Sequence, residues 1–151
     1  MSEDNPIRVF VTHMFSDHPD YHRVFEYLES ASNFFYKNCS LPDDMPAVGG
    51  QEAIKEKLLE QIRSAEIVIV ISTMYVENRS LITFELDAAQ AAQIPLIALE
   101  PFGGTGSIPA DVKARVSEVI PWNERTMVDV IKREARHEDT QRWEVIEFDL
   151  S

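Results

Sequence analysis

The sequence predicts an α/β domain built on a doubly wound, flavodoxin-like sheet of five parallel strands. Short runs rich in β-branched residues alternate along the chain with helical patterns, and these runs are apolar throughout. Continuous apolar strands separated by helices indicate a parallel sheet that is covered on both faces. With 151 residues, the chain has the length of one ordinary domain. We expect the strand order 2-1-3-4-5.

Hydrophobic periodicity places the elements in order along the chain. The strands are expected in IRVFVT (7–12), NFFYK (33–37), EIVIVIS (66–72), IPLIALE (94–100) and SEVIPW (117–122). Helical patterns occupy residues 20–31, 51–65, 80–93, 109–116 and 124–135. Together they define one domain over residues 1–135. In the tail, residues 136–151, apolar side chains alternate with acidic ones from Ile146 to Leu150, which predicts an extra edge strand or an arm that reaches a second subunit.

Composition argues against several classes of function. The net charge of −12 opposes binding to nucleic acid or to an anionic membrane. A single cysteine, Cys39, provides neither a disulfide framework nor a cysteine metal cluster, which fits a reducing cytosol. No apolar run approaches the roughly 20 residues of a membrane span, and the first residues do not resemble a signal peptide. We therefore expect a cytoplasmic protein.

The strand order predicts where a ligand binds. Open α/β sheets bind ligands beyond the carboxyl ends of the strands where the winding direction switches, here between the first and third strands. The segments expected to meet there are residues 12–17 and 72–80, flanked by the loop 38–50. They supply the candidate pocket residues His13, Phe15, Ser40, Ser72, Thr73 and Tyr75.

The helix SLITFELDAAQAAQ (80–93) contains a carboxylate at an unexpected position. With about 100° of rotation per residue, Glu85 falls inside the broad apolar arc of this helix, whereas Asp87 and Gln90 lie on the polar side. Burial of a carboxylate without partners costs several kcal/mol, so such a residue tends to line a site. The alternative is that Glu85 complements the positive end of its own helix or reaches solvent at the rim.

Three other motifs have simpler interpretations. FGGTGS (102–107) lacks the lysine of a P-loop and the spacing of a dinucleotide fingerprint, so we expect a surface loop. His18 and His22 have no acidic or cysteine companion at ligand spacing, so we expect solvated histidines and no metal site. Cys39 has no activating neighbour in the sequence and is expected to be a small, semi-buried residue.

The stretch IKEKLLEQIRSAEIVIVISTMYVENRSLITFELDAAQAAQIPLIAL resembles the TIR domain. RVFVTHMFSD near the start and PFGGTGSIPADVKARVSEVIPWNERTMVDVIK near the end are similar to the TIR-like family that includes the sensor protein of bacterial Thoeris anti-phage systems. This resemblance, over roughly residues 7–133, implies an enzyme that cleaves the N-glycosidic bond of NAD, with Glu85 at the position of the essential glutamate. It implies NAD as substrate with no further cofactor, a cyclic ADP-ribose-type signal or ADP-ribose as product, a separate effector protein and self-association.

Two positions depart from the TIR pattern. Leu81 stands where many TIR domains have tryptophan, and Arg79 stands where they often have serine. The first departure leaves base stacking to Phe15, Tyr75 or Phe84. Two other functions stay open from the sequence: a non-catalytic TIR-like module for interaction or nucleotide binding, and an enzyme like a nucleoside deoxyribosyltransferase that uses Glu85 as a nucleophile.

Overall fold

A single five-stranded parallel sheet forms the centre of the protein. The computed structural model describes residues 1–104 and 106–138. The sheet order is β2-β1-β3-β4-β5, and every neighbouring pair is parallel. The strands are β1 (Ile7–Val11), β2 (Tyr36–Asn38), β3 (Ile67–Ile71), β4 (Leu96–Leu99) and β5 (Glu118–Ile120). The predicted fold class and strand order are therefore confirmed.

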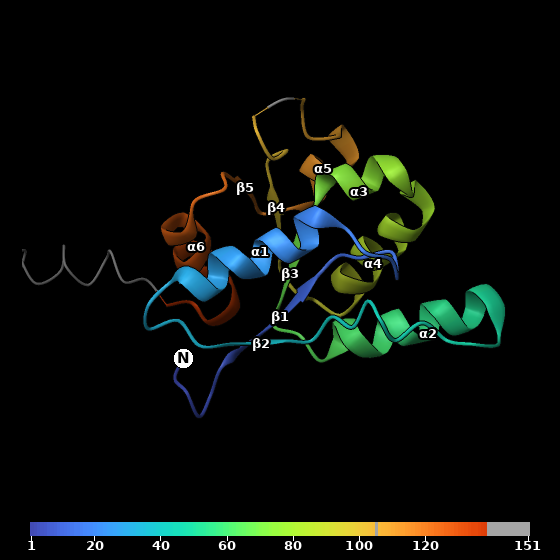
Figure 1. The fold of residues 1–151 in the computed structure, drawn as a ribbon, viewed down its shortest axis with the longest axis horizontal. Coiled ribbons are helices and arrows are strands. Elements are labelled where there is room, and N and C mark those ends of the chain that lie inside the picture. Colours follow the sequence, from blue (N-terminus) through green and yellow to red (C-terminus); the bar gives the residue numbers. More distant parts are fainter. Residues whose placement is uncertain (105, 139–151) are drawn as a thin grey trace, which may run out of the picture.

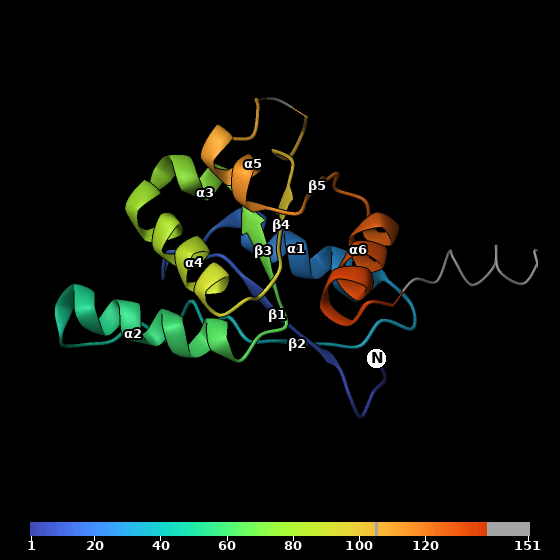
Figure 2. The same cartoon turned by 180° about the vertical axis from the view of Figure 1, so that it is seen from behind.

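Helices cover both faces of this sheet. They are α1 (Pro19–Ser30), α2 (Gly50–Arg63), α3 (Ser72–Glu77), α4 (Arg79–Ala91), α5 (Ala110–Arg115) and α6 (Glu124–Arg136). α1 packs beside α6 on one face (Figure 1), and α2 packs beside α4 on the other (Figure 2). Reversal of the winding direction after β1 places α1 and α2 on opposite faces, as a doubly wound sheet requires.

The sequence did not predict α3. The pattern of residues 72–80 indicates a loop, but Ser72–Glu77 form a helix of six residues that is separated from α4 by Asn78 alone. Asn78 ends α3 and also caps α4, because its Oδ1 accepts a hydrogen bond of 3.2 Å from the backbone N–H of Leu81. The short connection brings the start of α4, and with it Glu85, to the carboxyl edge of β3.

Two further local expectations need correction. β2 forms later than expected, at Tyr36–Asn38, since Phe34 turns into the core before the strand begins. His18 is not a solvated histidine: it is the N-cap of α1, and its Nδ1 accepts a hydrogen bond of 3.1 Å from the backbone N–H of Asp20. Its Nε2 lies 2.8 Å from a carboxylate oxygen of Glu77, so it also links α1 to α3.

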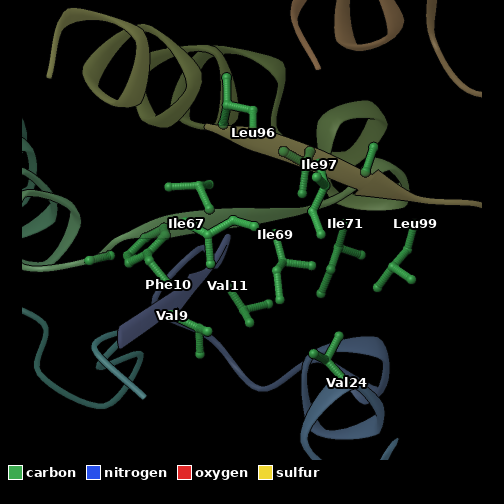
Figure 3. Packing of buried hydrophobic residues seen from close by; sticks show 14 of the residues in the cluster. Val9, Phe10, Val11, Val24, Ile67, Ile69, Ile71, Leu96, Ile97 and Leu99 are labelled. Atoms are coloured by element: carbon green, nitrogen blue, oxygen red, sulfur yellow. The ribbon is translucent and has the colours of Figure 1, made fainter. Parts of the chain in front are cut away.

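The hydrophobic core lies between the sheet and its helices. All five residues of β3 are buried, because this strand has a neighbour on each side and helices above and below. Figure 3 shows Val24 of α1 approaching the face of the sheet from which Val11, Ile69 and Ile71 project. The uninterrupted apolar strands of the sequence are explained by this burial on both faces.

Two expectations concerned the alternating tail and a membrane span. α6 runs to Arg136, and the alternating tail segment from Ile146 to Leu150 lies outside the described residues. Among the helices that the structure describes, none combines the length and the apolar character that a bilayer span requires.

A volume series at Ile69 tests the packing of the central strand. Ile69 is 1% exposed, so Ile69→Val should lower the free energy of unfolding by about 0.5–1.5 kcal/mol and Ile69→Ala by about 2–5 kcal/mol. Chemical denaturation measures both values. Val76→Ala, at a position that is 77% exposed, is the control and should change stability by less than about 0.5 kcal/mol. Equal effects at the two positions would contradict the assigned core.

Candidate functional site

Glu85 lies completely buried in the second turn of α4, at the carboxyl edge of the sheet. Its exposed fraction is 0%, and its Oε1 accepts a hydrogen bond of 3.1 Å from the backbone N–H of His13, which follows β1. Its Oε2 is buried and has no hydrogen-bond partner among the described residues. The predicted place of Glu85 in the apolar arc is confirmed. The alternative of a rim residue or a cap is wrong, since Asn78 caps this helix.

Burial dominates the electrostatics of Glu85. Removal from water raises the pKa of the carboxyl well above its usual range, and the hydrogen bond from His13 lowers that pKa by a smaller amount. Within the described part of the chain, no cation lies against the carboxyl to offset the loss of solvent. This carboxyl therefore keeps its proton to higher pH than an exposed glutamate does.

His13 is a second buried polar group beside Glu85. Its ring is fully buried, its Nε2 lies 2.8 Å from Oε1 of Gln61, and its Nδ1 accepts a hydrogen bond of 3.2 Å from the backbone N–H of Phe15. Burial lowers the pKa of the imidazole, and the hydrogen bond with Gln61 raises it by a smaller amount. The ring is thus held neutral, and it connects α2 to the loop after β1.

Phe15 covers this buried pair from the loop after β1. Its backbone is left-handed, with φ of 54°, and its ring meets the His13 ring edge-on with centroids 4.7 Å apart. Phe15 also lines a cavity of about 360 Å³, which we call the Phe15 cavity. The other lining residues include Met14, Met45, Ile54, Lys55 and Leu81. Glu85 is not among the lining residues of this cavity.

A second cavity adjoins the same loop. It measures about 430 Å³, and we call it the acidic cavity because Asp17, Asp43 and Asp44 line it together with Tyr21 and Ser40. The side chain of Ser40 is buried, and its Oγ lies 2.8 Å from the hydroxyl of Tyr21. Met14 and Phe15 line one cavity while Ser16 and Asp17 line the other, so the loop after β1 separates them.

The remaining candidate residues lie at the same edge of the sheet but make other contacts. Thr73 donates a hydrogen bond of 3.1 Å to Asp20 on α1, and Ser72 donates one of 3.3 Å to the carbonyl of Leu99. Tyr75 is turned toward α5, where its hydroxyl donates to Asp111 at 2.8 Å; Arg79 binds the same carboxylate at 2.9 Å. Phe84 is partly buried near Lys55, whose Nζ lies 5.4 Å from the ring centroid.

Gln61 is a site residue that sequence reasoning missed. It lies on α2, is only 5% exposed, and contacts both His13 and Leu41. A weak signal was present: Gln61 is buried on the same side of the helix as Leu58 and Ile62, and at about 100° per residue it falls about 60° from Leu58, at the edge of the apolar arc.

The weaker motifs contribute no chemistry to this site. His22 pairs with Asp17 at the surface, and Cys39 is a free thiol that is buried rather than semi-buried as expected. In FGGTGS the glycines on either side of Thr105 are exposed and have positive φ, which fits a surface loop. Within residues 1–104 and 106–138, no group of three or more His, Cys, Asp or Glu side chains is arranged to hold a metal ion.

The pH dependence of stability tests the burial of Glu85. A raised folded-state pKa means that the protonated carboxyl contributes its full stability below the unfolded-state pKa, and this contribution is lost as the pH rises toward the folded-state value. Glu85→Gln cannot titrate, so its free energy of unfolding relative to wild type should increase above about pH 4.3, by up to about 1.4 kcal/mol per pH unit, and then level off. Denaturation at a series of pH values measures this.

Glu56→Gln, which removes an exposed carboxylate from α2, controls for the loss of one charge. It should not reproduce the pH-dependent gain of Glu85→Gln. A difference between wild type and Glu85→Gln that is constant with pH would contradict the burial.

Comparison with known proteins supports the same architecture. A crystal structure described as that of a conserved protein from Enterococcus faecalis V583 matches with a TM-score of 0.55 and 12% identity, covering 85% of this chain and 99% of that one. At this identity the match shows the fold alone. A comparison with curated proteins finds no match. Residues 10–105, which include the end of β1, the loop after it, α2 and Glu85, match the family described as Thoeris protein ThsB, TIR-like domain. This chain therefore belongs to the Thoeris ThsB TIR-like domain family.

Proposed function

We propose that the protein cleaves the N-glycosidic bond between nicotinamide and ribose in NAD, with Glu85 as the catalytic carboxylate. The observation that carries this proposal is the unpartnered, fully buried Oε2 of Glu85 at the switch point between β1 and β3. Open α/β sheets bind ligands there. Family membership supports the proposal, because Glu85 matches the helix glutamate of TIR-type enzymes and lies inside the matched residues.

Cleavage of the nicotinamide–ribose bond needs little general acid catalysis. Nicotinamide in NAD is already cationic, so the bond from the anomeric carbon to the ring nitrogen breaks with its electron pair leaving on nicotinamide. Glu85 binds ribose hydroxyls and stabilises the positive charge that develops at the anomeric carbon. An oxygen of water, losing its proton to solvent, then gives ADP-ribose. Attack by an atom of the same ADP-ribose moiety instead gives a cyclic isomer and needs a site that excludes water.

The described arrangement corresponds to a closed form of such a site. Glu85 is fully buried and bonded to the backbone of His13, whose ring holds the backbone of Phe15, so in this proposal the loop that carries both residues moves before the ribose of NAD meets the carboxyl. Once substrate hydroxyls and water reach the group, the loss of solvation that raises its pKa is relieved, and ionisation to the reactive carboxylate becomes easier. The Phe15 cavity, which is lined by apolar side chains together with Gln51, Lys55, Asn78 and Ser80, is the entry that this opening would extend.

We propose that self-association opens and completes the site. The loop between β2 and α2 exposes Leu41, Met45 and Val48, at 50%, 56% and 82%, beside the two cavities. A second copy packed on this loop would bury apolar surface and complete the Leu81 wall of the Phe15 cavity. The nucleotide product would then leave and act on a separate effector protein in anti-phage defence.

Substitution of Glu85 tests the catalytic role. Glu85→Gln keeps the size of the side chain and should fold, while NAD turnover should fall by at least about a hundredfold, as expected when an electrostatic group of the transition state is removed. Chromatography of nicotinamide and the nucleotide products after incubation with concentrated protein measures turnover. Glu56→Gln, at an exposed position of α2 that lines neither cavity, is the matched control. A Glu85→Gln protein as active as wild type would refute the assignment.

A parallel incubation addresses the other two functions considered. Formation of a new nucleoside from a deoxynucleoside and a free base, without NAD turnover, would identify a deoxyribosyltransferase-like enzyme. Absence of both reactions in concentrated, folded protein would leave the non-catalytic module as the function.

The assembly step predicts a concentration dependence. Specific activity toward NAD should rise with protein concentration, because dilute single copies remain closed. Met45→Ser, which makes the exposed loop more polar without touching Glu85, should move this rise to higher concentration. Kinetics over a dilution series, alongside sedimentation, measures both effects. Activity per molecule that stays flat over the series, in a protein that turns over NAD, would eliminate the assembly step.

A further inference from the structure

Gln61 makes all of its hydrogen bonds inside the protein. Its Oε1 lies 2.8 Å from Nε2 of His13 and also accepts a hydrogen bond of 2.9 Å from the backbone N–H of Leu41. Its Nε2 donates a longer hydrogen bond of 3.4 Å to the carbonyl of Leu41. One uncharged side chain from α2 is thus bound both to the loop after β1 and to the loop between β2 and α2.

These contacts determine the tautomer of His13. Nδ1 of His13 accepts the backbone N–H of Phe15 at 3.2 Å, so this nitrogen carries no proton in the neutral ring. The proton of the imidazole is therefore on Nε2 and is donated to Oε1 of Gln61. The opposite amide orientation would direct the Gln61 NH₂ at two N–H donors, so the tautomer and the orientation require one another.

The chain of contacts ends at the carboxyl of the proposed site. The residue whose ring is held by Gln61 also donates its backbone N–H to Oε1 of Glu85. The same ring accepts the backbone N–H of Phe15 at its Nδ1, and Phe15 belongs to the loop that moves in the proposed function. We propose that Gln61 is a positioning residue that couples the loop between β2 and α2 to the opening of the Glu85 site. The effect of Gln61 on catalysis rests on the proposed function. The coupling between the loop and the site does not depend on it.

The place of Leu41 explains how the coupling works. Leu41 lines the acidic cavity and is half exposed, so a ligand or a second protein copy on this loop moves it directly. A shift of Leu41 withdraws a donor from Oε1 of Gln61 and frees the amide to rotate. Rotation removes the acceptor of His13 Nε2–H, the ring changes tautomer, and Nδ1 no longer holds the Phe15 backbone. Phe15 can then leave its position over Glu85.

NMR of the free protein tests the coupling directly. Long-range proton–nitrogen spectra of wild type should show His13 as the neutral Nε2–H tautomer. Gln61→Met keeps a similar volume and removes the shared acceptor, so His13 should lose this single tautomer. The amides of Phe15 and Leu41 should exchange with solvent about tenfold faster or more, as expected for loss of one buried hydrogen bond. Gln61→Asn, a milder variant that shortens the amide, should shift both readouts in the same direction if the Met variant does not fold.

A rescue variant distinguishes a positioning role of Gln61 from a role in stability alone. Gln61→Glu retains an acceptor for both His13 and Leu41, so at mildly alkaline pH it should restore the Nε2–H tautomer and slow the exchange of both amides. With NAD, Gln61→Met should raise the specific activity of dilute protein about tenfold, because Phe15 is no longer held, and Gln61→Glu should bring the activity back toward the wild-type value. Gln90→Met, at an exposed position of α4, controls for the substitution type.

An unchanged tautomer and unchanged amide exchange in both Gln61→Met and Gln61→Asn would overturn the coupling. Equal defects in Gln61→Met and Gln61→Glu would also overturn it. If wild type turns over no NAD, the proposed function fails, while the NMR comparison still decides whether Gln61 links the loop to His13 and Phe15.

Discussion

The buried carboxyl of Glu85 is the constraint on which the rest of the site depends. The domain buries this group completely and gives it one hydrogen bond, from the backbone N–H of His13. An isolated buried carboxyl is costly, so its protein partner must be held accurately. That requirement connects the end of β1, the first turns of α4 and the amide of Gln61 on α2 into one buried polar unit.

The fold accommodates the cost of burying the Glu85 carboxyl because the surrounding hydrophobic core is extensive. β3 is buried along its whole length and pairs with β1 and β4, and α4 buries Ile82, Leu86 and Ala89 beside Glu85. Functional centres often contain a charged or polar group whose burial is unfavourable. For a TIR-like protein of a defence-related family, this buried carboxyl fits the resting form that we propose, in which the group becomes reactive when the loop after β1 moves.

Much of the fold was predictable from the sequence because the apolar strand runs and the helix periods agree with each other. The same rotation argument that identified Glu85 applies to Gln61, yet α2 has a more polar surface and its buried side is narrower. α3 was missed because six residues carry too little periodicity, and no side chain caps its start. The direction of Tyr75 toward Asp111 depends on contact with α5, a distant segment, and no local pattern reveals it.

The carboxyl itself can be observed by carbon-13 NMR with glutamate labelled at its side-chain carboxyl, assigned by comparison with Glu85→Gln. We predict that the Glu85 resonance remains that of a protonated acid after the exposed glutamates have ionised, because burial raises its pKa well above the usual range. Addition of a non-hydrolysable NAD analogue should shift the same resonance selectively. A Glu85 carboxyl that ionises together with the exposed glutamates would contradict the central claim.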